Sequence, residues 1–458
     1  MPIPKIVIAG TGSGVGKTSI SIGLARAFSK KGMKVQTFKV GPDYLDPTHL
    51  TLASGRPCYN LDGWMMGKDY VRKLFYEKCH GADLAVVEGV MGLFDGAGAD
   101  SLAGSTAEIA KWLKAPVLLA VNAHGVARTF AALVQGCAAF TPGVNIAGVV
   151  ANNTGTARHI NLLKASLLNA CAPMLVGGIP RGGFIHLPGR HLGLVTANET
   201  SLSRDTLEGL AASVEKYLNL GQVIEIASNV SNLDGRLLCS VEHTSGGKTG
   251  IAVARDRAFH FYYSDILEMI ENAGGEILAF SPMKDKAIPR GAAGLYLGGG
   301  YPEEYAAVLS GNKEMLDAIR GFVNSGKPVY AECGGLMYLS KGIETKGKHF
   351  AMVGVLPVET RMLKRRKSLG YVEATLRGDS LWGANGDVFR GHEFHYSELV
   401  EAPIETDGWK KIYSITSRRA NDTTVEGYEK GNVLVSYAHL HYASKPGAVD
   451  HFIQKCGD

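Results

Sequence analysis

Short apolar runs alternate with amphipathic, helix-like stretches along the first half of the chain. Each run is about the length of a strand, and Gly, Pro and Asn cluster at the boundaries. Because this alternation is typical of a parallel sheet with crossover helices, the sequence predicts an α/β domain. The predicted strands are KIVIAG (5–10), KVQTFKV (34–40), DLAVVEGV (83–90), APVLLAVNA (115–123), VNIAGVVANN (144–153) and PMLVGGIP (173–180).

The periodicity fades after a predicted helix, DTLEGLAASVEKYLNL (205–220), where a polar passage rich in Ser, Asn and Gly begins. This passage predicts a linker over 226–248 between domains 1–225 and 249–458. A second alternating series then starts and becomes rich in strands, which predicts an α/β domain with an added antiparallel portion. Its predicted elements are strands at 250–256, 276–282, 294–300 and 328–335, helices at 264–275 and 313–324, and the β-rich strings VGVLPVET (353–360), GYVEATLR (370–377) and NVLVSYAHLHY (432–442).

Residues 10–19 read GTGSGVGKTS and follow directly on the first predicted strand. The usual phosphate-loop pattern, G-x-x-x-x-G-K-[ST], places its first glycine where this chain has Thr11, and Gly10 lies one residue earlier. The rest is intact: glycine N–H groups and a helix start face the phosphates, a lysine neutralises their charge and a hydroxyl can bind Mg²⁺. The predicted nucleotide-binding residues are Gly12, Ser13, Gly14, Val15, Gly16, Lys17 and Thr18.

Four acidic residues follow predicted strands of the first domain. Asp43 and Asp46 lie in the turn after KVQTFKV, Glu88 ends DLAVV, and Asp95 lies in the glycine-rich loop beyond it. Such sheets bind ligands at the carboxyl ends of their strands, and an acid beside a phosphate loop holds Mg²⁺. We expect Thr18, Glu88 and Asp43 to bind the metal, with Asp43 also near the nucleotide, and we assign Asp46 and Asp95 to the reaction. Solvent-facing turn carboxylates are the alternative for the three aspartates.

The string AECGGLMYL places Cys333 between an apolar strand and a helical run. A sharp strand–turn–helix connection exposes a nucleophile, and the helix start favours a thiolate. Upstream, LYLGGGYPE supplies a second glycine-rich strand end. The backbone N–H groups of Gly299, Gly300 and Gly334 are predicted to form an oxyanion hole for a tetrahedral intermediate.

These strings resemble known families. The loop G-T-x-x-x-V-G-K-T, taken with V-E-G-x-x-G at the second acid, resembles the dethiobiotin synthetase family of ATP-dependent ligases. The longer strings GPDYLDPTH and VVEGVMGLFDG resemble the cobyrinic acid a,c-diamide synthase family, and the likeness continues into the second half. The resemblance implies an α/β fold in which a P-loop parallel-sheet domain precedes a class I glutamine amidotransferase-like α/β domain.

The resemblance also implies a reaction: amidation of the a and c acetate carboxylates of cobyrinate through acyl phosphates, in cobalamin biosynthesis. ATP and Mg²⁺ are the implied cofactors, and a cobyrinate-type tetrapyrrole and glutamine are the implied small-molecule substrates. Hydrogenobyrinate and nickel sirohydrochlorin stay open as alternatives, because no string excludes them. The residues alone indicate only an ATP-driven glutamine amidotransferase.

The base that assists Cys333 is implied by the same resemblance. In related cobyric acid synthases the catalytic His lies in T-Y-L-H-G, and ungapped comparison aligns the first four letters of that string with residues 436–439. The resemblance therefore implies His439 as the base, with His441 as the alternative. Many class I members carry a Glu two residues after this His, where the chain has His441. The third member of the triad stays open between His441, a backbone carbonyl and an acid from elsewhere.

Composition excludes several classes. The 458 residues are 45% hydrophobic and 20% charged, with a net charge of +5, as in soluble globular proteins. Seven cysteines without CxxC pairs indicate neither a disulfide framework nor a zinc site, and His392 and His395 lack the spacing of a helical zinc site. With no room for a signal peptide and no apolar run of about 18 residues, we expect a cytoplasmic protein without membrane or nucleic-acid partners, and we allow for a homodimer.

Two other functional classes compete with a ligase. A partitioning-type P-loop ATPase carries a signature Lys in K-G-G-x-G-K-T, where this chain has Gly12, and it has no use for Cys333. A tetrapyrrole-binding regulator without catalysis does not need Lys17, Glu88 and Cys333 together. The residues therefore favour the ligase.

Overall fold

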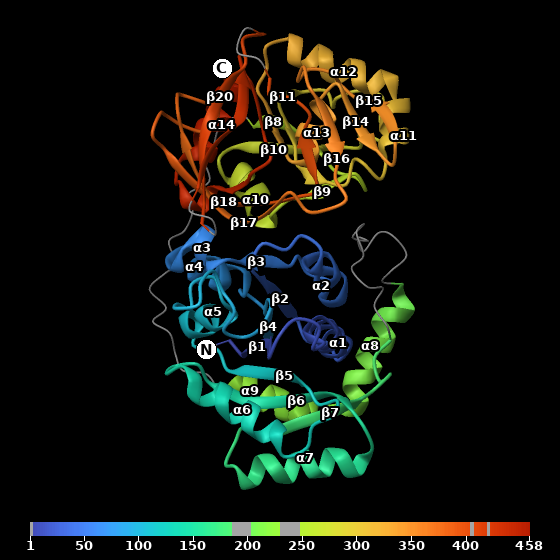
Figure 1. The fold of residues 1–458 in the computed structure, drawn as a ribbon, viewed down its shortest axis with the longest axis vertical. Coiled ribbons are helices and arrows are strands. Elements are labelled where there is room, and N and C mark those ends of the chain that lie inside the picture. The colour runs from blue at the N-terminus through green and yellow to red at the C-terminus, as the bar shows by residue number, and fades with distance from the viewer. Residues whose placement is uncertain (1–2, 186–202, 230–247, 404–406, 419–421) are drawn as a thin grey trace. The chain divides into compact units, whose positions relative to one another are not determined.

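A computed structural model describes residues 3–185, 203–229, 248–403, 407–418 and 422–458. The chain divides into two compact units, Met1–Cys239 and Ser240–Asp458 (Figure 1). Residues 226–228, which the sequence assigned to the linker, instead belong to a helix. The linker residues 230–247 lie outside the described residues.

The N-terminal unit is built on a seven-stranded sheet of order β3-β2-β4-β1-β5-β6-β7, in which all the paired neighbours run parallel. The six strands predicted for this half are present, and β3 is an additional short one. The strands are β1 (Lys5–Gly10), β2 (Val35–Val40), β3 (Tyr59–Leu61), β4 (Leu84–Glu88), β5 (Val117–Asn122), β6 (Ile146–Thr154) and β7 (Leu175–Pro180).

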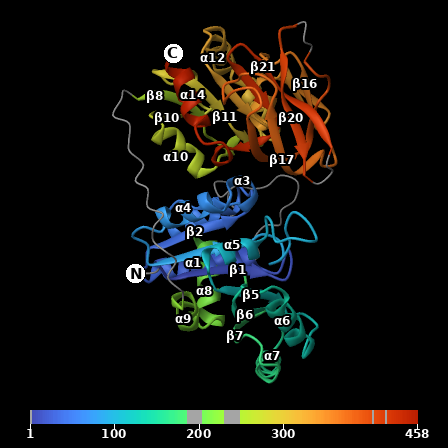
Figure 2. The ribbon, with the colours of Figure 1, turned by 90° about the vertical axis from the view of Figure 1, so that its left-hand side faces the viewer.

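Helices cover both faces of this sheet (Figure 2). On one face, Ile8 of β1 packs in a core with Leu24 of α1 and Leu210 of α8. On the other, the ring of Phe38 in β2 lies 4.9 Å from that of Phe75 in α4, centroid to centroid. The helices are α1 (Lys17–Lys30), α2 (Asp46–Ser54), α3 (Gly63–Met66), α4 (Lys68–Lys78), α5 (Thr106–Leu113), α6 (Thr129–Phe140), α7 (Ala157–Asn169), α8 (Arg204–Tyr217) and α9 (Leu220–Ser228).

The register of β1, β2 and β4 places the carboxyl ends of these three strands side by side. Glu88, the last residue of β4, is the partner of Ile8 in β1 on one side and of Lys39 in β2 on the other. Because parallel strands all end at one edge, the loops after β1, β2 and β4 leave the sheet together. This edge therefore gathers the phosphate loop and the acidic residues that the sequence singled out.

The C-terminal unit contains a ten-stranded sheet of order β10-β8-β11-β13-β22-β21-β20-β17-β18-β23. Its first five strands pair in parallel and its later strands antiparallel, which confirms the predicted α/β domain with an antiparallel addition. The strands of this sheet are β8 (Thr249–Ala254), β10 (Gly275–Phe280), β11 (Ala292–Leu297), β13 (Val329–Glu332), β17 (Ser368–Leu376), β18 (Val388–His395), β20 (Lys410–Ser417), β21 (Thr423–Lys430), β22 (Val433–Ser436) and β23 (His439–His441).

Smaller sheets and α-helices complete the described part of this unit. β9 (Phe259–Phe261) pairs with β12 (Gly299–Gly300), and a four-stranded sheet has the order β15-β14-β16-β19. Its strands are β14 (Gly342–Thr345), β15 (Lys348–Ala351), β16 (Glu359–Met362) and β19 (Ser397–Leu399). The helices are α10 (Ser264–Asn272), α11 (Ala306–Gly311), α12 (Lys313–Asn324), α13 (Gly334–Leu339) and α14 (Ala448–Gly457).

The prediction of β-structure for VGVLPVET (353–360) is wrong for most of that string, because only its last two residues belong to a strand. Val353 and Leu356 are buried, but their N–H groups donate to carbonyls of Tyr338 and Leu339 at the end of α13 rather than to a neighbouring strand. Gly354 has a φ of 77°, which turns the chain there. The apolar residues in this string therefore fill the core from an irregular segment.

Across the part of the chain that the structure describes, none of the helices combines the length and the apolar character needed to cross a membrane.

Candidate active sites

The phosphate loop lies between β1 and α1. Gly16 has a φ of 99°, and α1 begins directly after it with no side chain capping its first N–H groups. Around Gly12 and Gly14 there is open space, whereas a Cβ on Gly10 would lie 2.4 Å from Val15 Cγ2. Gly10, the glycine that lies one residue before the usual position, therefore allows Val15 to pack closely against the end of β1. The open loop after it presents backbone N–H groups to an anion.

Lys17 is held over this loop. Its Nζ donates to the carbonyl of Gly12 at 2.8 Å and also to the carbonyl of Met91. Burial, followed by repulsion from Lys39, lowers the pKa of Lys17 to about 8. An anionic phosphate beside the ammonium would favour its charged form, as expected for a phosphate-binding lysine.

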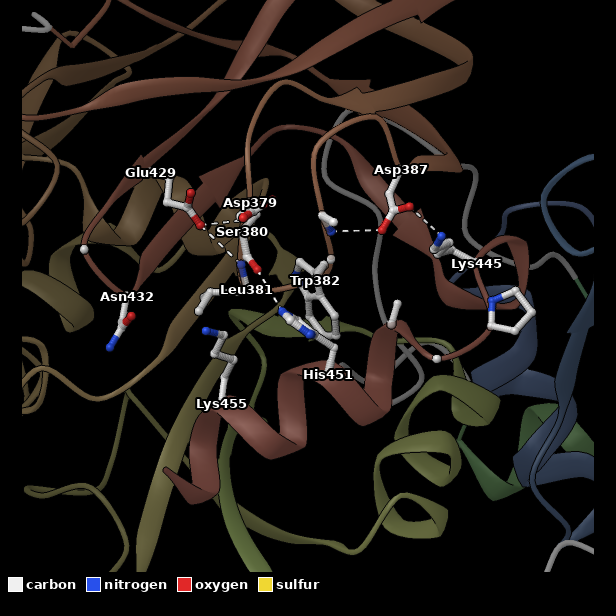
Figure 3. Close-up of a pocket in the computed structure, with 16 residues that line it drawn as sticks. Asp379, Ser380, Leu381, Trp382, Asp387, Glu429, Asn432, Lys445, His451 and Lys455 are labelled. Carbon is white, nitrogen blue, oxygen red and sulfur yellow. Dashed lines mark hydrogen bonds and ion pairs between the residues drawn. The ribbon is translucent and has the colours of Figure 1, made fainter.

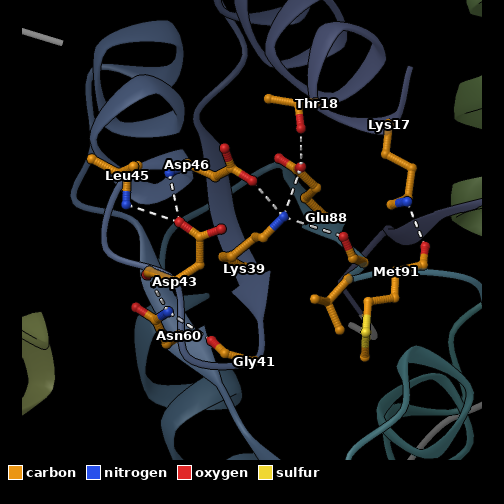
Figure 4. Close-up of polar contacts among 12 residues, drawn as sticks. Lys17, Thr18, Lys39, Gly41, Asp43, Leu45, Asp46, Asn60, Glu88 and Met91 are labelled. Carbon is orange, nitrogen blue, oxygen red and sulfur yellow. Dashed lines mark hydrogen bonds and ion pairs between the residues drawn. The ribbon is translucent and has the colours of Figure 1, made fainter. Parts of the chain in front are cut away.

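A buried cluster of charge lies next to the loop (Figure 4). Lys39 Nζ lies 2.6 Å from Asp46 Oδ2 and 2.8 Å from Glu88 Oε1, and all three side chains are buried. Burial opposes the charged form of Lys39, but attraction to Asp46 and Glu88 outweighs it and raises its pKa. Burial raises the pKa of Glu88 to about 7, with Lys39 pulling in the opposite direction.

The sequence analysis missed Lys39. The signal available was a lysine one residue before the end of a predicted strand. Its register partner is Glu88, so only the order of the strands reveals that the two side chains meet. A buried lysine of this kind is kept charged by its paired carboxylates.

The residues predicted to bind Mg²⁺ are only partly brought together. Thr18 Oγ1 donates to Glu88 Oε1 at 2.6 Å, while Asp43 Oδ1 closes a turn by accepting from the N–H groups of Leu45 and Asp46. Within the described residues, Glu88 Oε2 is buried and makes no hydrogen bond. A hydroxyl and a carboxylate side by side are the oxygen ligands that Mg²⁺ takes, so Thr18 and Glu88 fit the ion.

Asp95 also closes a turn, because its Oδ2 accepts from the N–H of Gly92 at 2.8 Å. Its charge contributes to the electrostatic environment of Lys17. The carboxylates of Asp43 and Asp95 therefore each have a structural task at the edge where the sequence placed them. Binding of the metal and the nucleotide by Asp43, and a role of Asp95 in the reaction, stay predictions.

In the C-terminal unit, Cys333 lies at the sharp turn between β13 and α13. Its φ of 46° and ψ of −99° are strained for a residue with a side chain, as in a nucleophile elbow. A Cβ on Gly334 would lie 3.0 Å from the nitrogen of Gly300, and one on Gly335 would lie 2.1 Å from the carbonyl oxygen of Leu297. The glycines after Cys333 thus allow the helix start to approach β11 and β12, which brings the predicted oxyanion-hole backbone together.

His439 is the histidine that the fold brings to Cys333. It begins β23, which follows β22 after two intervening residues. Because β22 pairs with β13, His439 reaches the edge of the sheet where Cys333 follows β13. A Cβ on Gly299 would lie 2.5 Å from His439 Cε1, so the ring packs against the predicted oxyanion-hole strand. His439 Nδ1 lies 3.6 Å from Glu332 Oε2, and both residues are buried.

Glu332 is therefore the acid that the sequence analysis left open. Two tyrosine hydroxyls hold it, that of Tyr330 on Oε1 at 2.8 Å and that of Tyr296 on Oε2 at 3.0 Å. Burial opposes a charged imidazole, but the nearby Cys333 and Glu332 side chains outweigh it and raise the pKa of His439 to about 10. The raised pKa favours an imidazolium beside the sulfur, which is the arrangement that activates a cysteine nucleophile.

His441 and His395 have partners other than Cys333 and Glu332. His441 Nε2 lies 3.2 Å from Asp265 Oδ2, so its acid is not that of His439. His395 stacks on Tyr437, with ring centroids 4.1 Å apart. Among the described residues, no group of three or more His, Cys, Asp or Glu side chains is arranged to hold a metal ion.

A cavity of about 480 Å³ lies elsewhere in the C-terminal unit (Figure 3). Trp382, Glu429 and His451 are among its lining residues, and none of the predicted site residues lines it. Its walls carry both signs of charge, with Asp387 and Lys445 paired on one side. The cavity is separate from the Cys333 site.

Two family models match this chain, one on each unit. Residues 6–194 match the CobQ/CobB/MinD/ParA nucleotide binding domain, and residues 250–447 match the CobB/CobQ-like glutamine amidotransferase domain. A nucleotide-binding domain joined to a domain with a Cys–His–Glu site defines an ATP-dependent amidating ligase that uses glutamine.

Full-length relatives give the particular family. The cobyrinate a,c-diamide synthase of Syntrophotalea carbinolica is 50% identical over 457 residues, which cover 100% of this chain and 99% of that protein. The cobyrinate a,c-diamide synthase of Leptospira interrogans (serovar copenhageni) is 45% identical, over 99% of this chain and 98% of that protein. That of Salmonella typhimurium is 38% identical, over 98% of this chain and 97% of that protein. The chain belongs to the cobyrinate a,c-diamide synthase family.

The buried cluster predicts a stability that depends on pH. Lys39→Met removes the cation between two buried carboxylates, and breaking such a pair costs about 3–5 kcal/mol. Without Lys39 the pKa of Glu88 rises further above about 7 in the folded variant. The folded variant therefore binds a proton at a pH where the unfolded chain has released it. Its free energy of unfolding consequently recovers as the pH falls. We expect urea unfolding to show a larger loss at about pH 8 than at about pH 5.5. The exposed Lys34→Met serves as the control, and an equal loss at both pH values contradicts the account.

The Glu332 contact predicts the titration of His439. Glu332→Gln keeps the shape of the side chain but removes its charge, so we expect the pKa of His439 to fall from about 10 by about one to two units. An NMR pH titration of the His439 ring measures it. Glu429→Gln changes another glutamate of the same unit and should leave the titration unchanged. An unaltered His439 pKa in Glu332→Gln would show that this carboxylate does not stabilise the imidazolium.

Proposed function

We propose that this enzyme amidates the a and c acetate carboxylates of cobyrinate, with ATP and glutamine as co-substrates, in cobalamin biosynthesis. The observation that carries the proposal is the elbow cysteine with its His439–Glu332 pair, in a chain that also has a phosphate loop beside a buried acid. The full-length relatives named cobyrinate a,c-diamide synthase support the substrate.

The N-terminal site activates the carboxylate. A carboxylate is a poor electrophile, so one of its oxygens attacks the γ-phosphorus of ATP, which forms an acyl phosphate and releases ADP. Ammonia then attacks the acyl carbon, and phosphate leaves as the amide forms. Lys17 and the loop N–H groups stabilise charge on the transferring phosphoryl group. Thr18 and Glu88 would hold Mg²⁺, which neutralises phosphate charge when it is bound.

The aspartates at this edge have supporting roles in the proposal. Asp46 and Lys39 form a buried pair next to Glu88, which fixes the carboxylate that faces Thr18. Asp43 and Asp95 shape the turns that border the nucleotide and the substrate carboxylate. Direct binding of the metal by Asp43 stays a prediction beside that of Thr18 and Glu88.

The C-terminal site supplies the ammonia. The thiolate of Cys333 attacks the side-chain amide carbon of glutamine, and the N–H groups of Gly299, Gly300 and Gly334 stabilise the oxyanion. The imidazolium of His439 gives its proton to the departing nitrogen, and a γ-glutamyl thioester remains. Water, deprotonated by the neutral imidazole, then releases glutamate and restores the thiolate.

The related tetrapyrroles hydrogenobyrinate and nickel sirohydrochlorin are the alternative substrates for the same chemistry. A partitioning-type P-loop ATPase is the alternative of another class, and one of the two matching family models also covers that class. The full-length match to amidating enzymes and the Cys333 site both favour the ligase over it.

Release of ADP tests this assignment. We expect the enzyme to release ADP rapidly only when both cobyrinate and a nitrogen source are present, because the acyl phosphate forms on the substrate. Hydrogenobyrinate and nickel sirohydrochlorin, assayed in parallel, rank the three tetrapyrroles by kcat/KM. A rate of ADP release that does not depend on any of the three tetrapyrroles indicates a partitioning ATPase. No release of ADP under any condition indicates a binding protein.

The division of labour predicts opposite effects of two variants. Cys333→Ala should abolish glutamine-supported amidation, by about 10³-fold or more, yet keep ammonia-supported amidation near the wild-type rate, because only the nitrogen source is lost. Glu88→Gln should abolish both, because both need the ATP step. Mass spectrometry of the product with each nitrogen donor measures this. Loss of ammonia-supported amidation in a folded Cys333→Ala variant argues against separate sites.

A further inference from the structure

The string FRGHEFH, for which the proposed reaction has no role, forms β18 and lies directly beside the strand of the catalytic histidine. In the antiparallel register of β18 and β23, His392 is the partner of His439. Their rings are stacked, with centroids 5.0 Å apart and planes inclined by only 13°, and both residues are buried. A Cβ on Gly391 would lie 2.1 Å from the carbonyl oxygen of His439, so glycine is required for this approach.

His392 is itself held from the segment that leads into α10. The hydroxyl of Tyr263 lies 2.8 Å from His392 Nε2, and Tyr263 is buried. The Tyr263 ring also lies 5.1 Å from that of His441, whose Nε2 pairs with Asp265 Oδ2. The residues just before α10 and in its first turn thus anchor both histidines that neighbour the catalytic one.

The contact with Glu332 does not by itself fix the orientation of the His439 ring. The 3.6 Å between His439 Nδ1 and Glu332 Oε2 is longer than an ordinary hydrogen bond, so it attracts the imidazolium without fixing the tilt of its ring. A ring stacked face to face restricts that tilt directly. Small errors in the placement of a proton-transfer group lower the rate steeply.

We propose that His392, held by Tyr263, is a positioning residue that orients the His439 ring for proton transfer between Cys333 and the departing ammonia. This proposal rests on the proposed glutaminase reaction and adds a residue that acts through His439 rather than on substrate.

The charges around the stack are compatible with this role. Tyr263, His439 and His441 are among the titratable groups near His392. Burial, followed by repulsion from His439 and His441, lowers the pKa of His392 well below its usual value. A neutral ring therefore faces the His439 imidazolium, and a second cation does not oppose the charge that the reaction needs.

The test compares His392→Ala, which removes the stacked ring, with His392→Phe, which keeps a ring of similar shape. We expect His392→Ala to lower kcat for glutamine hydrolysis about 10- to 100-fold. Glutamine KM should change less than about twofold. Ammonia-supported amidation should stay at the wild-type rate, which shows that the N-terminal site is intact, and an unchanged near-UV circular dichroism spectrum shows that the C-terminal unit is folded. His392→Phe should recover most of kcat, and His451→Ala, a histidine of α14 outside this site, should match wild type.

Alkylation of Cys333 by iodoacetamide, followed as a function of pH, separates orientation from packing. In His392→Ala the reactivity should rise at a higher pH than in wild type, because a misaligned imidazolium stabilises the thiolate less. Tyr263→Phe, which removes one hydroxyl and no packing volume, should shift the profile in the same direction and keeps the test available if His392→Ala does not fold.

A wild-type kcat and alkylation profile in His392→Ala would overturn the proposal, and so would a His392→Phe variant as impaired as His392→Ala. The proposed function fails in a different way, through a wild-type enzyme that hydrolyses no glutamine.

Discussion

Charge that is buried at the carboxyl edge of a parallel sheet is the constraint on which both sites depend. Lys39 lies among Asp46 and Glu88 in one unit, and His439 lies between Cys333 and Glu332 in the other. Removed from water, each cation persists only because an anion is held within a few ångströms of it. The strands fix those distances, because the register and the order of the sheet decide which side chains meet.

The same constraint prepares each unit for its ligand. Lys17, with its pKa lowered to about 8, and Glu88, with its pKa raised to about 7, are both less charged than they would be in water. An incoming phosphate favours the charged lysine, and a cation favours the charged glutamate. In the other unit Cys333 and Glu332 belong to the site before substrate binds, and they favour the imidazolium by raising the pKa of His439. The first site is thus completed by its ligands, whereas the second is charged in advance.

The sequence predicted the features that depend on local pattern. The strands of the first unit, the phosphate loop and the strained turn at Cys333 all follow from residues near one another in the chain. The partners of those residues could not be predicted this way. Lys39 meets Glu88 only through the pairing of β2 with β4, and Glu332 meets His439 only because β13 pairs with β22. The segment VGVLPVET shows the converse error, in which an apolar string fills the core without forming a strand.

The central claim is that one unit converts a carboxylate into an acyl phosphate while the other releases the nitrogen that displaces phosphate. A double isotope experiment tests it most directly, with cobyrinate labelled by ¹⁸O in its acetate carboxylates and glutamine labelled by ¹⁵N in its side-chain amide. The account predicts one ¹⁸O atom in each inorganic phosphate released and ¹⁵N in each new amide. Amidated product accompanied by unlabelled phosphate would contradict the acyl phosphate, and with it the account of the N-terminal site.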